Sequence, residues 1–210
     1  MCRLSGKTTL LRTVASQVER KSHRLVYFNL TTLTAAGLVR VLARHLRVSI
    51  CRSQPETIRA ISGALDHDPG HTLLTVDEAQ FLPPETFSEL RTLVEADLSG
   101  KRPLAVVFCG MPELRERLQA PALFPLWRRI EHRIEIAGLR LDEARPFARH
   151  LLGDEQAARF SDEGLSLLFE RSRGEPGSLG SGLRLLCRRI REGPIAPEVI
   201  EPIIENWNLA

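Results

Sequence analysis

The sequence predicts an α/β domain with a mostly parallel sheet flanked by helices, followed by a small all-helical domain. Through residues 1–138, short apolar segments alternate with segments of helical periodicity. Strands separated by helices pair in parallel, because a parallel crossover needs about the length of a helix. After Gly138 only helical periodicity remains. We therefore expect an α/β core at residues 1–138 and a helical domain at residues 139–210, with a boundary near Gly138–Leu141.

The elements of the core are predicted from hydrophobic spacing. Leu10, Leu11, Val14 and Val18 recur at helical spacing, whereas LVYFNL (Leu25–Leu30) is short, apolar and β-prone. The expected helices lie at residues 7–20, 35–46, 56–65, after Pro84, and 113–119. The expected strands lie at residues 25–30, 72–76, 104–109 and 133–136, and the helical domain contains helices at 142–152, 162–172, 182–191 and 197–207.

Composition and cysteine usage are those of an ordinary globular protein. Hydrophobic residues make up 43% and charged residues 26% of the chain, and the formal net charge is +3. The four cysteines are far apart and form no CxxC pair, so neither a zinc site nor a disulfide framework is indicated. No apolar run approaches the roughly 20 residues that span a bilayer. We expect a cytoplasmic protein with reduced thiols and no membrane span.

A phosphate-binding loop is predicted at SGKTT, which contains Ser5, Gly6, Lys7, Thr8 and Thr9 and opens the first helix. Backbone N–H groups at a helix N-terminus bind phosphate. Lys7 is expected to reach the β- and γ-phosphates of ATP, and the Thr8 hydroxyl to bind Mg²⁺. The alternative is a surface turn with a capping serine before an ordinary amphipathic helix.

The loop motif is incomplete at its N-terminal side. GxxxxGK[ST] would place its first glycine at Met1, and the strand that precedes it would lie upstream. Two explanations stay open, an N-terminal truncation and a degenerate site. We expect truncation.

Two adjacent acids end a predicted buried strand in LLTVDEAQ. Asp77 is expected to hold the Mg²⁺ shell, and Glu78 to orient and deprotonate the attacking water. The alternative is that both are exposed acids in the first turn of a helix, where negative charge is favourable. The occurrence of this strand end downstream of GKTT favours an ATP site.

With both motifs in place, the chain resembles the AAA+ ATPases of the ExeA (general secretion protein A) type and of the TniB/TnsC type, which are helper ATPases of bacterial transposition. The resemblance covers essentially the whole chain and implies a P-loop AAA+ core followed by a helical lid, with ATP and Mg²⁺ as cofactors. The segments that carry it are GKTTLLRTV, VDEAQFLPPETFSELRTL, FCGMPELRERL, LWRRIEHRIEIAGL and LDEARPFARHLL.

The resemblance also implies an ATP site at a subunit junction, completed by an arginine from the neighbouring subunit of a homo-oligomer. Arg129 is the first candidate for this arginine finger, followed by Arg133 and Arg128. The alternative is that these arginines form a solvated basic face.

The chain departs from the family pattern beyond its missing strand. Met111 stands where the family has a polar residue after the fourth strand, and Ser181 stands where it has a second sensor arginine. Arg184, roughly one helical turn further, is the candidate substitute. These departures favour nucleotide binding over rapid hydrolysis.

Three functions fit these features. The first, which we expect, is a transposition helper that oligomerises on duplex DNA with ATP bound and recruits or activates a transposase. The second is an ExeA-like secretion-assembly ATPase, whose relatives continue into a membrane span and a wall-binding domain. The third is a degenerate nucleotide-binding module with no turnover. The basic run Arg188, Arg189 and Arg191 indicates either a solvated helix face or a contact with the DNA backbone.

Overall fold

The structure is a computed structural model, and it describes residues 6–18, 23–29, 34–67, 70–95 and 104–204 of the 210-residue chain. These residues form two compact units, one comprising Lys7–Arg133 and the other including Ile134–Ala210. Each unit has its own hydrophobic core. Their assignment to a nucleotide-binding core and a lid stays a prediction. Across the described ranges, no helix has the length and apolar character to cross a membrane.

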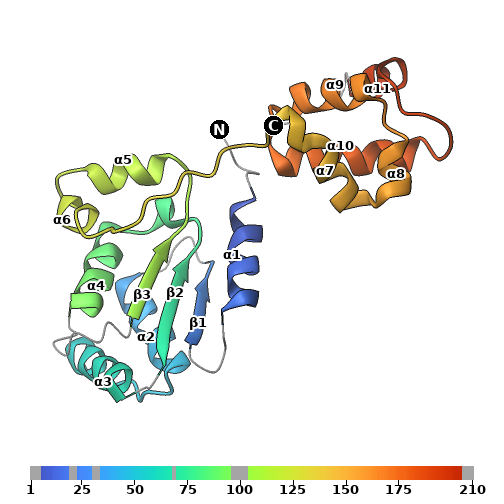
Figure 1. Cartoon of the computed structure of the whole chain (residues 1–210). Helices are drawn as coiled ribbons and strands as arrows, with labels where there is room; N and C mark the ends of the chain where they lie inside the picture. The colour runs from blue at the N-terminus through green and yellow to red at the C-terminus, as the bar shows by residue number, and fades with distance from the viewer. Residues whose placement is uncertain (1–5, 19–22, 30–33, 68–69, 96–103, 205–210) are drawn as a thin grey trace. The chain divides into compact units, whose positions relative to one another are not determined.

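A three-stranded parallel sheet forms the centre of the first unit (Figure 1). It contains β1 (His23–Phe28), β2 (His71–Val76) and β3 (Leu104–Phe108), in the spatial order β1-β2-β3. The register aligns Phe28 with Val76 and Val76 with Phe108, so the three strands end together. This sheet confirms the predicted parallel arrangement with helices between successive strands.

One face of the sheet carries most of the first core. Alternate residues of β1 and β2 are almost fully buried, Val26 and Phe28 on one strand and Leu74 and Val76 on the next, because successive side chains of a strand point to opposite faces. The helices of this unit are α1 (Lys7–Gln17), α2 (Ala35–His45), α3 (Gln54–His67), η1 (Ala79–Phe81), α4 (Pro84–Glu95), α5 (Glu113–Gln119) and α6 (Phe124–Trp127). All of them except α1 contribute to this core, by buried residues or by partly buried ones packed against it.

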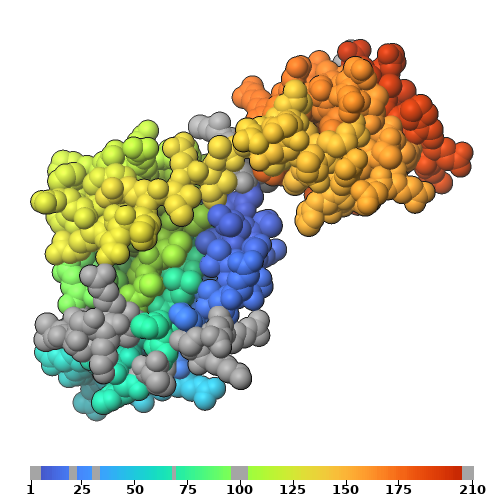
Figure 2. Space-filling view, in the orientation of Figure 1, coloured from blue at the N-terminus to red at the C-terminus, as the bar shows by residue number. Residues whose placement is uncertain are grey.

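The opposite face of the sheet is more open. On this face, Thr75 of β2 lies in register with Tyr27 of β1 and with Val107 of β3. Tyr27 and Val107 are both exposed. Helix α1 has no buried residue, and Figure 2 shows it as a long stretch of accessible surface. Helix α1 therefore owes little of its position to core packing.

The strand predicted near residues 133–136 is wrong. Residues 130–140 form neither helix nor strand, and Ile134 is 85% exposed. The alternating pattern of Arg133–Ile136 suggested a strand, but a strand is stable only when neighbouring backbone pairs with it. The described residues offer this segment no such pairing.

The second unit is helical, as predicted, with one isolated β-bridge between Phe160 and Ile195. Its helices are α7 (Leu141–Leu152), α8 (Asp154–Ala158), α9 (Asp162–Ser172), α10 (Pro176–Arg189) and α11 (Pro197–Ile204). Helix α10 begins six residues before the predicted start at 182. Pro176 occupies its first turn, where a proline costs no intrahelical hydrogen bond.

Candidate functional site

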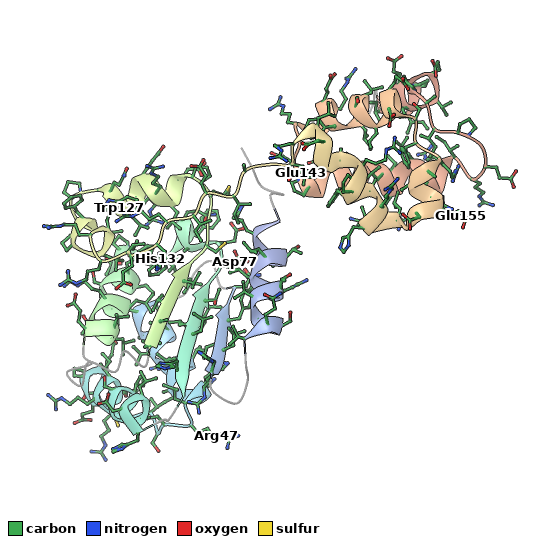
Figure 3. All side chains as sticks on the ribbon, in the orientation of Figure 1. Arg47, Asp77, Trp127, His132, Glu143 and Glu155 are labelled. Carbon is green, nitrogen blue, oxygen red and sulfur yellow. The ribbon has the colours of Figure 1, made fainter. Side chains whose placement is uncertain are left out.

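The candidate site lies where the three parallel strands end. Asp77 directly follows β2, and Figure 3 shows it at the C-terminal end of that strand. Backbone hydrogen bonds extend the ladder to this level, from the Asp77 N–H to the Phe28 carbonyl and from the Cys109 N–H to the Val76 carbonyl, each at 2.8 Å. Open parallel sheets bind ligands at the carboxyl ends of their strands.

Asp77 is 2% exposed, and its carboxylate accepts hydrogen bonds from three groups. The Thr8 hydroxyl and the Tyr27 hydroxyl each donate to Oδ2 at 2.8 Å. The Glu78 backbone N–H donates to Oδ1 at 2.9 Å. A buried carboxylate needs such donors to offset the loss of water. The fold therefore brings the predicted phosphate loop and the predicted acid pair together across 69 residues of sequence.

The pKa values of two neighbouring groups show that the site is electrostatically shared. Burial, followed by the hydrogen bond to Asp77, raises the pKa of Tyr27 to about 12. Burial, followed by the Asp77 charge, raises the pKa of the Cys109 thiol to about 11, while Lys7 acts to lower it and Glu78 to raise it. The charges of Lys7, Asp77 and Glu78 therefore all act on the Cys109 thiol at this end of the sheet.

The N-terminus of α1 follows a glycine with a positive φ. Gly6 has a φ of +83°, which L side chains rarely adopt, and a Cβ built there would meet nothing within 4 Å. Lys7 and Thr8 follow at the first helical positions, both half-exposed. Thr9 is exposed, and its carbonyl accepts a hydrogen bond from the Thr13 hydroxyl within the helix. Ser5 lies outside the described residues.

The oxygen atoms of Thr8 and Asp77 fit a magnesium ion. The Thr8 hydroxyl donates its proton to Asp77 in a hydrogen bond, so the lone pairs of its oxygen can coordinate a metal. Mg²⁺ prefers oxygen ligands and is usually held by one or two protein groups together with substrate phosphates and water, rather than by a cage of protein ligands. Among the described residues, no cluster of three or more His, Cys, Asp or Glu side chains that could hold a metal ion occurs.

Glu78 lies beside Asp77 in a left-handed conformation, with φ 52° and ψ 36°. Its side chain is half-exposed, and Oε2 accepts a hydrogen bond from Nε2 of Gln80 at 2.6 Å. The turn that follows is held by Arg117, whose guanidinium donates to the carbonyls of Gln80 and Leu82 and lies over the Phe87 ring.

Two of the predicted arginines, Arg129 and Arg133, have partners within the first unit. The Arg129 Nε forms an ion pair with Glu95 at 2.6 Å. Arg133 lies over the Trp127 ring, 4.1 Å from its centroid, and donates to the Trp127 carbonyl at 2.8 Å.

The two remaining arginine candidates are exposed. Arg128 follows α6, and Arg184 lies on α10 in the helical unit. The site roles of all four arginines stay predictions.

Sequence reasoning did not single out four residues that complete the site. Tyr27, Gln80, Cys109 and Arg117 all contact or electrostatically influence its acids or the turn that carries them. One signal was available for Tyr27, which is the single tyrosine of the chain and interrupts an apolar strand. Gln80 lies within the quoted LLTVDEAQ segment, two residues after Glu78. Cys109 and Arg117 act through contacts between distant segments, which no local pattern reveals.

Comparison with known proteins places the chain in a family. A model described as "AAA domain" matches residues 3–118, more than half of the chain. General secretion pathway protein A of Aeromonas hydrophila is 31% identical over 120 residues, which are 56% of this chain and 21% of that protein. The chain thus spans about a fifth of the length of this curated relative.

Two solved structures support the fold. Cdc6p from Pyrobaculum aerophilum matches with a TM-score of 0.71 at 20% identity, over 96% of this chain and 58% of that one. The ORC2 protein of Aeropyrum pernix, in its ADP form, matches with a TM-score of 0.67 at 13% identity, over 97% of this chain and 60% of that one. These likenesses confirm the predicted P-loop AAA+ fold. Because the family model covers more than half of the chain, this chain belongs to the AAA domain family.

Proposed function

We propose that this chain binds ATP with Mg²⁺ and hydrolyses it at the strand-end site. The observation that carries the proposal is the hydrogen bond of 2.8 Å between the Thr8 hydroxyl and the Asp77 carboxylate. It joins the lysine-bearing helix start to the acid pair, which is the pairing that a magnesium-bound triphosphate requires. The family match supports the same reading.

Each residue has a distinct task in this proposal. The first-turn N–H groups of α1 and the Lys7 ammonium bind the phosphates, and Thr8 and Asp77 would hold Mg²⁺. When bound, the ion neutralises charge on the phosphate oxygens. Glu78 accepts a proton from water as the water oxygen bonds to the γ-phosphorus. The bond from that phosphorus to the bridging oxygen breaks, which releases ADP and phosphate.

Two substitutions test the tasks separately. Lys7→Ala is expected to weaken ATP binding at least about tenfold, because it removes the cation that contacts the phosphates. Glu78→Gln is expected to retain binding and to lower the turnover number by about 10²-fold or more, because an amide cannot accept the proton. Binding is measured by isothermal titration calorimetry and turnover by phosphate release.

Matched controls come from α3, on the same unit. Arg59→Ala and Glu56→Gln remove exposed charges from that helix and should leave binding and turnover within about twofold of the parent. If Glu78→Gln turns over at the parent rate, Glu78 does not activate the water. If the parent chain binds no ATP, the proposal fails as a whole.

We further propose that a neighbouring copy supplies an arginine to this site. The Arg129 pair with Glu95 involves side chains that are more than one-third exposed, and such pairs are weak and easily exchanged. Mixing Glu78→Gln with Arg129→Ala is expected to restore turnover, since an intact site of one variant can then meet an intact arginine of the other. The same mixture with Arg133→Ala tests the second candidate. Absence of any restoration for both would exclude an arginine shared in this way.

For the cellular role, the relative named general secretion pathway protein A supports secretion assembly over the transposition role that the sequence led us to expect. No comparison specifically supports a transposase partner. Arg188, Arg189 and Arg191 of the helical unit are exposed, and they are the candidate contacts with the backbone of duplex DNA. Retention on duplex DNA that requires ATP and falls steeply with salt would favour transposition. Lack of such retention would favour secretion assembly.

A further inference from the structure

Gln80 is a buried polar side chain that the proposed chemistry does not use directly. It lies in η1, three residues after Asp77, and is 7% exposed. Its Nε2 donates to Glu78 Oε2 at 2.6 Å, and its Oε1 accepts the Met111 N–H at 3.2 Å. Because a backbone N–H can only donate, Oε1 must face Met111 and the amide nitrogen must face Glu78. Glutamine therefore satisfies both neighbours in one orientation.

The loop after β3 is built around this amide. A Cβ at Gly110 would lie 2.6 Å from the Gln80 Oε1, so the glycine leaves the space that the amide fills. The Ala79 N–H donates to the Cys109 carbonyl at 2.8 Å, and Arg117 donates to the Gln80 carbonyl. The turn is therefore tied to the end of β3 and to α5, which fixes where the Gln80 amide points.

Glu78 is held by this arrangement. Its left-handed backbone is unfavourable for a residue with a side chain and persists only where surrounding contacts determine it. The Gln80 amide engages Oε2 of the Glu78 carboxylate, so Oε1 is the oxygen left to accept a proton from water.

We propose that Gln80 is a positioning residue for ATP hydrolysis, which aims the Glu78 carboxylate and ties it to the Cys109–Pro112 loop. This inference rests on the proposed hydrolysis at the same site. Gln80 contacts the proton acceptor but touches neither nucleotide nor water in this scheme. Its loss should therefore impair turnover and spare ATP binding.

Two substitutions separate positioning from simple packing. Gln80→Leu keeps the approximate size and removes both hydrogen bonds, and it is expected to lower kcat at least tenfold with the ATP dissociation constant within about twofold of the parent. Gln80→Glu keeps the acceptor for Met111 but places a second carboxyl group against Glu78. Because two adjacent carboxyl groups do not both ionise readily, the acidic limb of the pH–kcat profile should move upward by about one pH unit or more.

Gln54 provides a matched control, because its Nε2 donates to Glu89 Oε1 at 2.8 Å on α3 and α4 of the same unit. Gln54→Leu and Gln54→Glu repeat the same chemical changes away from the site. They should leave kcat and its pH profile unchanged. Urea unfolding of all four variants shows whether the Gln80 variants fold. If Gln80→Leu does not fold, Gln80→Glu, which is nearly identical in shape to the parent, carries the test.

A readout that needs no turnover tests the contact itself. In ¹⁵N-labelled protein, the Gln80 side-chain amide signal, identified by its loss in Gln80→Leu, is expected to shift in Glu78→Gln, because this substitution replaces the charged oxygen that accepts its hydrogen bond. A Gln80 amide signal that is the same in Glu78→Gln as in the parent chain would overturn the inference at its first step.

The outcomes distinguish this inference from the function on which it rests. An active parent whose kcat is unchanged by Gln80→Leu, or whose pH profile is unchanged by Gln80→Glu, overturns the positioning role and leaves hydrolysis standing. A parent that binds ATP without turnover overturns hydrolysis and the positioning role with it. In that case the effect of Glu78→Gln on the amide signal shows whether the Gln80–Glu78 contact exists as a structural link alone.

Discussion

At the scale of single residues, the site depends on how one buried carboxylate is satisfied. Asp77 gathers hydrogen bonds from the Thr8 and Tyr27 hydroxyls and from the Glu78 backbone. Its charge in turn acts on the Cys109 thiol, where it adds to the effect of burial. The same charge that would bind a metal shell therefore suppresses the reactivity of the nearest cysteine.

This coupling predicts slow alkylation of Cys109. With a pKa of about 11, only about one thiol in a thousand is ionised at pH 8, and the thiolate is the reactive form. Iodoacetamide should modify Cys109 at least about tenfold more slowly than it modifies glutathione, with a rate that rises as the pH approaches 11. Asp77→Asn removes a charge that raises this pKa, so it should speed the reaction. Mass spectrometry of the Cys109 peptide measures the rate.

Cys51 supplies the internal reference for that experiment. It precedes α3, where its backbone N–H bonds to Thr57, and it has no part in the Asp77 network. Its alkylation rate should be the same in the parent and in Asp77→Asn. A Cys109 as reactive as glutathione, or one indifferent to Asp77→Asn, would contradict the electrostatic account.

At the scale of elements, the connection between α9 and α10 requires a glycine, because the backbone conformation and the available space both exclude a side chain. Gly174 follows α9 with a φ of +68°, and a Cβ there would lie 2.6 Å from the Leu139 carbonyl and 3.2 Å from the Phe169 ring. Its own carbonyl accepts the Leu139 N–H at 2.7 Å. Gly174 thus links the segment before α7 to the α9–α10 connection by a backbone hydrogen bond, at a distance that leaves no space for a side chain.

Gly174→Ala is therefore expected to destabilise the helical unit by about 3 kcal/mol, from left-handed strain of about 1–2 kcal/mol together with the steric clash. Gly193→Ala is the matched control, because Gly193 has a φ of +86° but nothing within 4 Å of its Cβ position. It should lose only about 1 kcal/mol. Urea unfolding followed by circular dichroism measures both. Equal losses would show that the close approach at Gly174 contributes nothing.

At the scale of the whole molecule, the described residues carry two separate hydrophobic cores. One contains Leu74, Val76 and Phe87 around the sheet, and the other contains Leu168, Leu183 and Leu186 among the helices. Each core is drawn from the residues of one compact unit. Units with independent cores can unfold in separate transitions.

Leu74→Ala and Leu183→Ala test this independence, since both parent side chains are fully buried and each change should cost about 2–5 kcal/mol. In a Trp207→Phe background, Trp127 is the remaining tryptophan and packs against the first core. Leu74→Ala should lower the fluorescence transition of Trp127, whereas Leu183→Ala should leave it in place and lower a transition seen by circular dichroism. Equal shifts of both signals by either variant would indicate one cooperative unit.

The sequence by itself determined the elements that have strong periodicity, and it singled out the candidate site residues that belong to local motifs. The parallel strands and most helices follow from apolar spacing, which reflects one-sided burial and needs no knowledge of the partner. Lys7 and Thr8 at a helix start, and Asp77 and Glu78 at a strand end, are readable for the same local reason. The early start of α10 was missed, because PGSLGSG has poor helix propensity and only close packing, as at Gly180 near Leu151, favours small residues there.

Only the tertiary structure decided which residues surround those motifs. Tyr27 reaches Asp77 from a neighbouring strand, and Gln80 spans from one turn to the Met111 backbone. The apparent strand at residues 133–136 did not form, because alternation supplies a face to bury but no neighbour with which to pair. Local patterns encode what a segment prefers. Contacts between distant segments depend on where the fold places them, and these contacts set the hydrogen bonds and pKa values of the site.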